Sequence, residues 1–364
     1  MVAVTVYGIM LRVMPTRALR IAQVAPLWVP VPPRTYGGIE LMLSWLSREL
    51  LKRSHKVTLF ASGDSTAEVP TESPITKALW LHGSIRSPHA AVIKLLHMLK
   101  ERAPSFDVIH NHFNFFMFPL ALFERMPPIL STVHRPIDPL YAEVMKLFPQ
   151  IRFCVLSEDA RRSAQEQGID VRDVVPNGID VSAYPYNGEP ENYFLYLGRC
   201  NKEKGVVTAL NAARRAGKKL VIGGNVVGVE EWTYFMHEVQ PLLNQPDVRF
   251  VGQVDFDRKV KLLRGAQALL FPVERREPFG LVMIEAMACG TPVVAFRQGS
   301  VPEIVTHGVN GFIVETEEEM ADAMKRVSEI DRAACRTSVE KKFSLARMAS
   351  EYEKLYRSVI DSAG

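Results

Sequence analysis

The sequence predicts an α/β protein made of two doubly wound domains. Apolar strand-like segments alternate with helix-like segments along nearly the whole chain, a pattern typical of βα units on parallel sheets. Asparagine, glycine and several prolines between residues 175 and 190 interrupt this alternation, which then restarts. The 364 residues suffice for two domains that each bury a core. We therefore expect an extension at 1–19, domains at 20–184 and 185–342, and a last helix at 343–364.

Each predicted domain contains five clear strand segments. In the first domain they begin at Arg20, Lys56, Asp107, Ile129 and Arg152, and in the second at Tyr193, Lys219, Val248, Ala268 and Thr291. The helix expected from about Ile39 has an apolar stripe at i, i+3, i+4, i+7 and i+11, which indicates packing on a sheet. The stripe from Leu345 to Val359 predicts that the last helix also packs, on the first domain.

Composition excludes several classes of protein. The formal net charge of +4 is too small to indicate a nucleic-acid partner. The four cysteines are far apart and form no metal-binding pair, which favours reduced thiols in a cytoplasmic protein. No run of eighteen apolar residues is present, so no membrane span is expected. Residues 2–10 are apolar but lack a basic segment before them, so they make a poor signal peptide, and Met14 is a plausible start.

One carboxylate stands in a segment that is otherwise apolar. Residues 281–289 read LVMIEAMAC, with Glu285 as the single charged side chain, and Glu277 lies eight positions upstream. An unpaired carboxylate is strongly disfavoured in a core, so Glu285 needs a polar partner that its sequence neighbours do not supply. A ligand is the favoured partner, and backbone groups or a distant arginine are the alternative.

Two loops place cations or glycine at the start of predicted helices. The loop 198–205 carries Arg199 and Lys204, and a second loop leads into Gly280 and Leu281. Helix N-termini and fixed cations both favour an anion, and together they would balance the charge of a diphosphate without a divalent metal. Solvated lysines are the alternative, because neither loop is a complete phosphate-binding fingerprint.

A third loop contains the pair Gly37 and Gly38 before the first predicted helix. Paired glycines allow the backbone to approach a ligand closely, but they also suit a plain turn into a helix.

Three histidines and an aspartate pair are residue types that can bind a metal ion. His110, His112 and His134 end or follow strands but lack a carboxylate or thiolate complement, so hydrogen bonding to a ligand fits better than metal binding. A packed histidine is the alternative for His134. Asp255 and Asp257 form a D-x-D, a spacing that can bind Mn²⁺ or Mg²⁺, but they precede a helical stretch and are expected to cap it.

Four segments in combination resemble the GT-B glycosyltransferases of the retaining family 4. They are Gly37-Gly38-Ile39-Glu40, Pro176-Asn177-Gly178-Ile179-Asp180, Gly198-Arg199 with Lys204-Gly205, and the block from Glu277 to Val294. The resemblance extends from about residue 20 to the carboxyl end, and its Glu-x7-Glu block is highly specific.

This resemblance implies a UDP- or GDP-hexose donor bound mainly by the second domain and a hydroxyl acceptor bound mainly by the first. It gives Glu285 the ribose hydroxyls, Glu277 the sugar hydroxyls, Arg199 and Lys204 the diphosphate, and His134 a place beside the transferred sugar. The other donor-binding residues that it implies are Gly37, Gly38, Val254, Phe279, Gly280 and Leu281. It further implies transfer with retained configuration by front-face attack, in which a departing phosphate oxygen takes the acceptor proton, with no cofactor or metal required.

The acceptor side is predicted less sharply. His110, His112 and Phe113 are expected to contact the acceptor, and residues 113–123 would form either an apolar acceptor wall or, as the composition favours, a buried helix. Residues 90–100 carry two lysines beside apolar positions, so weak contact with a membrane surface and packing on a sheet both fit. The oligomeric state is not predicted.

Four other functions are compatible with parts of this pattern. A nucleotide-sugar epimerase or a phosphorylase would share the fold, but the Glu-x7-Glu block favours transfer. A non-catalytic protein that binds nucleotide sugar would keep the same charged residues. An NAD dehydrogenase is disfavoured, because no G-x-G-x-x-G follows either opening strand.

Overall fold

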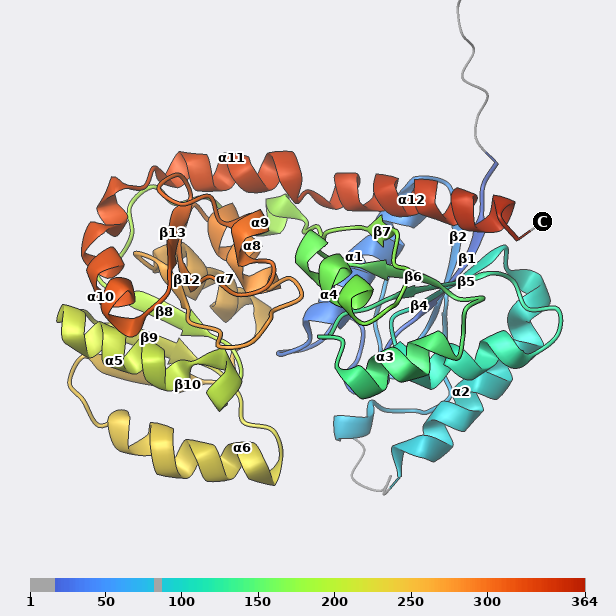
Figure 1. Cartoon of the computed structure of the whole chain (residues 1–364), viewed down its shortest axis with the longest axis horizontal. Helices are drawn as coiled ribbons and strands as arrows, with labels where there is room; N and C mark the ends of the chain where they lie inside the picture. Colours follow the sequence, from blue (N-terminus) through green and yellow to red (C-terminus); the bar gives the residue numbers. More distant parts are fainter. Residues whose placement is uncertain (1–16, 82–86, 364) are drawn as a thin grey trace, which may run out of the picture.

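The computed structural model describes residues 17–81 and 87–363 of the chain. It contains two sheets, one in each half of the sequence, and all the strand pairs within them are parallel (Figure 1). The predicted α/β fold with two doubly wound domains is confirmed. The expected extension lies outside the described residues as far as residue 16.

The first sheet has seven strands in the order β3-β2-β1-β4-β5-β6-β7. Their bounds are β1 (Arg20–Val24), β2 (Lys56–Phe60), β3 (Thr71–Glu72), β4 (Val108–Asn111), β5 (Ile129–Thr132), β6 (Arg152–Val155) and β7 (Asp173–Val174). The strand order reverses between β1 and β4, and ligands of doubly wound folds bind at such a point, beyond the carboxyl ends of the strands.

Helices cover both faces of this sheet. They are α1 (Gly38–Lys52), α2 (Pro88–Arg102), α3 (Pro139–Lys146) and α4 (Glu158–Glu166), together with the 3₁₀ segment η3 (Asn114–Leu122). One core, on the side of α2, η3 and α3, includes Leu95, Phe118 and Met145, whereas α1 contributes Leu43 and Leu46 to the core on the opposite face. Strands β1, β2, β4, β5 and β6 therefore bury side chains on both faces, which explains their largely apolar sequences.

The second sheet has six strands in the order β10-β9-β8-β11-β12-β13. Its strands are β8 (Phe194–Leu197), β9 (Leu220–Gly223), β10 (Val248–Gly252), β11 (Leu269–Phe271), β12 (Val293–Phe296) and β13 (Gly311–Val314). The helices of this domain are α5 (Val206–Ala216), α6 (Gly228–Tyr234), α7 (Phe256–Gly265), α8 (Leu281–Ala288), α9 (Val301–Ile304) and α10 (Glu317–Arg326).

The last two helices, α11 (Arg332–Lys342) and α12 (Leu345–Asp361), follow one another along both domains (Figure 1). Helix α11 packs on α8 of the second domain, and α12 packs on α1 and on strands β4 and β5 of the first. The chain thus crosses between the domains twice, and backbone hydrogen bonds join the two crossing segments to each other. The Ile179 N–H donates to the Phe343 carbonyl at 3.0 Å, and the Leu345 N–H donates to the Ile179 carbonyl at 2.9 Å.

Candidate functional site

A cavity of about 360 Å³ lies between the two domains. Residues that follow the carboxyl ends of strands in both sheets line it, among them His134 after β5 and Gly198 after β8. All ten residues predicted to bind the donor line this cavity, as does His134. The ten are Gly37, Gly38, Arg199, Lys204, Val254, Glu277, Phe279, Gly280, Leu281 and Glu285. The fold therefore brings together residues that are up to 248 positions apart in the sequence.

Glu285 lies on α8 and is 5% exposed. Its Oε1 accepts a hydrogen bond from the Tyr184 hydroxyl at 2.7 Å and one from the Lys259 ammonium at 2.6 Å. The expectation that a ligand would be its partner is therefore wrong for this oxygen, because distant segments of the chain supply two donors. Within the described residues no hydrogen bond reaches the Glu285 Oε2, and the side chain lines the cavity. The second oxygen is available to a ligand.

Glu277 shows the same arrangement at the other end of its block. Its Oε2 accepts a hydrogen bond from Lys204 Nζ at 2.5 Å, while Oε1 receives none from the described residues. The loop that carries Glu277 is held from behind, since the Ser300 N–H donates to the Glu277 carbonyl at 3.0 Å and the Ser300 hydroxyl to the Phe279 carbonyl at 2.8 Å. Each carboxylate is thus anchored by a lysine and keeps one oxygen without a partner in the described part of the chain.

Arg199 also has a partner that the sequence did not indicate. Its guanidinium forms an ion pair with Glu231 of α6, and Glu231 accepts further hydrogen bonds from Asn201 Nδ2 and from the Val227 N–H. Although burial opposes ionisation, these donors hold the pKa of Glu231 below its usual value. Glu231 therefore orients Arg199 at the cavity wall and offsets part of its charge.

Two glycines let helices of the second domain begin beside the cavity. Gly280 precedes α8 with φ of 79°, a left-handed conformation that side chains rarely adopt, and its neighbour Leu281 opens the helix. Gly205 precedes α5 with φ of 70°, and a Cβ there would lie 1.9 Å from the Pro272 carbonyl oxygen. Phe279, Gly280 and Leu281 line the cavity, so the N-terminus of α8 faces it as predicted for an anion site.

The first domain approaches this helix start closely. Gly38 begins α1, and a Cβ on Gly38 would lie 3.1 Å from the Leu281 Cδ1. Gly37, just before it, has φ of 150°. Gly38 therefore permits close contact between the starts of α1 and α8 across the cavity, whereas Gly37 packs against Pro33 and Val29 of its own domain.

The histidines and Phe113 predicted on the acceptor side occupy two different environments. His134 lines the cavity, whereas His110, His112 and Phe113 are fully buried and do not. His110 bonds to Tyr356 and Thr132 in the interior. Contact of these three residues with an acceptor is thus unsupported, because their side chains are fully buried and do not line the cavity.

Phe113 and the segment after it are part of the core. Phe113 packs against Trp28 and Phe116, and Met117, Phe118 and Leu120 of η3 are buried. The buried alternative for residues 113–123 is confirmed for these side chains, and none of them forms a wall of the cavity.

Asp255 caps α7, since its carboxylate accepts a hydrogen bond from the Arg258 N–H at 2.8 Å. The capping alternative for the D-x-D is therefore confirmed for Asp255. In residues 17–81 and 87–363, no cluster of three or more histidine, cysteine or acidic side chains is placed to hold a metal ion. Over the same ranges, no helix has the length and apolar character needed to cross a membrane.

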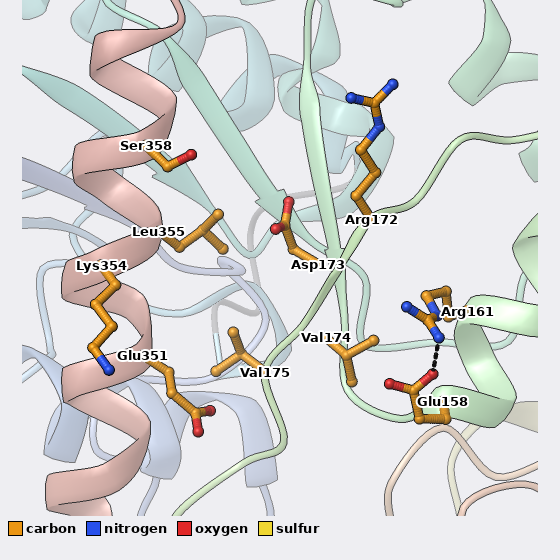
Figure 2. Close-up of a pocket in the computed structure, with 10 residues that line it drawn as sticks. All are labelled: Glu158, Arg161, Arg172, Asp173, Val174, Val175, Glu351, Lys354, Leu355 and Ser358. Atoms are coloured by element: carbon orange, nitrogen blue, oxygen red, sulfur yellow. Dashed lines mark ion pairs between the residues drawn. The ribbon is translucent and has the colours of Figure 1, made fainter.

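A second cavity, of about 450 Å³, lies away from the predicted site residues. Figure 2 shows it between α12, which carries Glu351 and Lys354, and the strand that carries Asp173. Its acidic groups already have partners, because Glu351 pairs with Arg347 at 2.5 Å and Asp173 with Arg152 at 2.5 Å. This second cavity lacks the convergent unpaired groups of the cavity between the domains.

Sequence reasoning missed several polar residues that line the cavity between the domains. Lys259, Asn225 and Arg275 lie there, and so does Asn177, whose buried Oδ1 has no hydrogen-bond partner among the residues that the structure describes. Asn177 stands in the PNGID segment and Asn225 follows β9, so both positions were visible as loop residues at strand ends. Lys259 gave no signal, because it is one of several lysines and arginines on an amphipathic helix.

Comparison with known proteins agrees with this arrangement. The family model described as "Glycosyltransferase Family 4" matches residues 36–183, and the model described as "Glycosyl transferases group 1" matches residues 185–342. The two models therefore correspond to the two domains, and residues matched by each of them line the cavity between the domains.

Individual relatives cover most of the chain. A glycogen synthase of Mycobacterium tuberculosis is 27% identical over 77% of this chain and 79% of its own length. A phosphatidyl-myo-inositol mannosyltransferase of the same species is 24% identical over 94% of this chain and 98% of its own. The crystal structure of the Anabaena protein HepE in complex with UDP and glucose has a TM-score of 0.74 at 18% identity, covering 93% of this chain and 100% of that one. The chain therefore belongs to the GT-B glycosyltransferases, with a family 4 domain followed by a group 1 domain.

Proposed function

We propose that this glycosyltransferase moves a hexose from a UDP- or GDP-sugar to a hydroxyl acceptor, with retained anomeric configuration and without a metal ion. The observation that carries the proposal is the pair of anchored carboxylates. Lys204 holds one oxygen of Glu277 and Lys259 holds one oxygen of Glu285, so each carboxylate offers its second oxygen to the cavity. Free carboxylate oxygens suit ribose and sugar hydroxyls, which donate hydrogen bonds.

The charges around the cavity support binding of a diphosphate. Five cations line it, namely Arg135, Arg199, Lys204, Lys259 and Arg275, against the two carboxylates of Glu277 and Glu285. The start of α8 adds the positive end of a helix dipole. These groups are suited to stabilise the negative charge that develops on a departing diphosphate, which is the task that a metal ion performs in other sites.

The acceptor side of the cavity supports the retaining mechanism. Among the described residues of the first domain that line it, none is an aspartate or a glutamate. His134 is the titratable imidazole there, and burial lowers its pKa to about 3, so it is a weak base at neutral pH. An inverting reaction needs a base that activates the acceptor hydroxyl. In the mechanism that we propose, a phosphate oxygen of the leaving group takes this proton instead.

The fold alone does not distinguish an enzyme from a binding protein, so the test measures both donor binding and sugar release. The protein is first titrated with UDP-, GDP- and ADP-hexoses in EDTA, which identifies the donor that binds. That donor is then incubated with the enzyme in water, and the first hexose released is observed by proton NMR before it mutarotates.

An α-donor should release the α-hexose first, because a front-face reaction with water retains the configuration. Release of the β-hexose would contradict the retaining mechanism. Binding without any release or transfer, across a panel of sugar and lipid acceptors, would favour a non-catalytic nucleotide-sugar-binding protein. A strict requirement for Mn²⁺ or Mg²⁺ would contradict the metal-free reaction.

A further inference from the structure

A chain of hydrogen bonds connects the C-terminal helix α12 with His134 at the cavity. Gln23 Nε2 bonds to the Tyr356 hydroxyl at 3.0 Å, Gln23 Oε1 lies 3.1 Å from His112 Nε2, and His112 Nδ1 lies 2.9 Å from His134 Nε2. Tyr356, Gln23 and His112 are fully buried, so water does not compete for these bonds. The chain is formed by side chains from α12, β1 and the segments after β4 and β5.

The orientation of Gln23 sets the direction of this chain. Its amide nitrogen donates to Tyr356, so its carbonyl oxygen faces His112. A carbonyl oxygen only accepts, and therefore His112 Nε2 carries the hydrogen. Burial, together with the neighbouring His110 and His134, keeps the pKa of His112 well below its usual value, so the ring is neutral. The other nitrogen, Nδ1, then has a lone pair.

The lone pair on His112 Nδ1 decides the state of His134. Because that nitrogen accepts, His134 Nε2 must donate and carry the hydrogen. His134 is neutral as well, so its own Nδ1 is left as an acceptor. No hydrogen bond from the described residues reaches this nitrogen, and the ring lines the cavity. The opposite tautomer would bring two lone pairs together between the rings.

Helix α12 holds the other end of the chain. The Tyr356 hydroxyl lies 2.7 Å from His110 Nδ1, and His110 Nε2 lies 2.8 Å from the Thr132 hydroxyl. Tyr352, one turn earlier on α12, bonds to the same Thr132 at 3.1 Å, and among the described residues the side-chain hydrogen bonds of Gln23 go to Tyr356 and His112 instead. Tyr356 and Tyr352 are therefore similar residues on one helix, but Tyr356 bonds to Gln23 directly, whereas Tyr352 is linked to it through Thr132, His110 and Tyr356.

We propose that Gln23 is a positioning residue of this enzyme. Through His112, Gln23 holds His134 in the tautomer whose Nδ1 accepts a hydrogen bond from a sugar hydroxyl in the cavity. Helix α12 in turn orients Gln23 through Tyr356. The proposal rests on the proposed function only in taking the ligand to be a sugar. It also predicts which substituents the sugar can carry where it meets His134 Nδ1. A hydroxyl at that position is recognised as a donor, whereas a fluorine or a methoxy group there is not.

The test compares three variants by two independent readouts. Gln23→Leu removes both amide groups, Tyr356→Phe removes the hydroxyl that orients Gln23, and Tyr352→Phe is the matched control. Long-range proton–nitrogen NMR spectra of protein with labelled histidine report which ring nitrogen of His134 is protonated, and His134→Ala assigns its signals. Steady-state kinetics give kcat and KM for the sugar donor, and calorimetry gives the affinity for the nucleoside diphosphate alone.

We expect wild type and Tyr352→Phe to show His134 protonated at Nε2. In Gln23→Leu this preference should be lost, with kcat/KM lower by about tenfold, the cost of one hydrogen bond to a ligand, and with nucleotide affinity unchanged. Tyr356→Phe should show the same changes to a smaller extent, which keeps the test valid if Gln23→Leu does not fold.

A wild-type His134 protonated at Nδ1 would overturn the proposal, and so would a tautomer and kcat/KM that are the same in Gln23→Leu as in wild type. If the wild type transfers no sugar at all, the proposed function fails, while the NMR spectra still decide the tautomer.

Discussion

Replacing Glu285 with alanine should weaken nucleotide binding far more than it weakens the fold. Its Oε2 is the oxygen without a partner among the described residues, and we propose that it accepts hydrogen bonds from the ribose. A hydrogen bond to a charged group contributes about 1.5–3 kcal/mol. The dissociation constant of the cognate nucleoside diphosphate should therefore rise by about 10- to 150-fold.

The same substitution also affects stability, because it leaves the Tyr184 hydroxyl without an acceptor and Lys259 without its carboxylate. A buried hydroxyl that loses its partner costs about 1–3 kcal/mol, and Lys259 keeps some access to solvent, so the fold should survive. Tyr184→Phe separates the two effects. It removes a bond to the occupied oxygen only, from a side chain that does not line the cavity.

Calorimetric titration at 25 °C, with thermal unfolding in parallel, measures both quantities. Tyr184→Phe should lower the free energy of unfolding by about 1 kcal/mol and change nucleotide affinity by less than about threefold. Wild-type affinity in Glu285→Ala would refute the assignment of Oε2 to the ligand. Equal loss of affinity in both variants would show that the pairing of Glu285, rather than its free oxygen, governs binding.

Three further predictions concern other parts of the chain. Gly205→Ala should lower the free energy of unfolding by more than about 2 kcal/mol, because its Cβ would overlap the Pro272 carbonyl. Gly217→Ala should lower it by about 1 kcal/mol, because Gly217 has φ of 63° but open space around it. Equal values for the two variants in urea unfolding would contradict this difference. Burial raises the pKa of Glu40 from 4.5 to about 7, so between these two pH values the folded protein keeps a proton on Glu40 that the unfolded chain releases. The free energy of unfolding should therefore fall by about 3 kcal/mol as pH rises from about 4.5 to about 7. Glu40→Gln should abolish that fall, and an unchanged pH profile of the variant would show that Glu40 is not its source. Asp255→Ala should lower the free energy of unfolding by about 1 kcal/mol, because α7 loses its cap. Nucleotide affinity should be unchanged, both in Mn²⁺ and in EDTA. A loss of affinity in Mn²⁺ alone would instead indicate that Asp255 binds a metal ion.

Much of the fold was predictable because its strands are apolar and its helices amphipathic. The ten predicted strands were found within one or two residues, as was α12. Strands β3 and β7 were not predicted, since two residues each are too short for any periodicity. Strand β13 was also missed, although Phe312 and Val314 are buried in it, because its four residues follow a glycine and an asparagine that suggest a turn.

In the site, sequence reasoning found residue types at strand ends and helix starts, but not their partners. The ion pairs Glu285–Lys259 and Arg199–Glu231 join different helices and loops, so no local sequence pattern predicts them. His110 and His134 look alike in the sequence, each near the end of a strand. His110 lies within β4, and its ring bonds to Tyr356 and Thr132 in the interior, whereas His134 lies two residues beyond the end of β5 and lines the cavity.

Calorimetric titration of the wild-type protein with UDP-, GDP- and ADP-hexoses in EDTA tests the central claim most directly. The claim is that lysine-anchored Glu277 and Glu285, with the cations and the start of α8, bind a nucleotide sugar without metal. We predict one-to-one binding of one of these donors in EDTA, with an affinity that Mn²⁺ leaves unchanged. Absence of binding by all of them, or binding only when Mn²⁺ is present, would contradict the account.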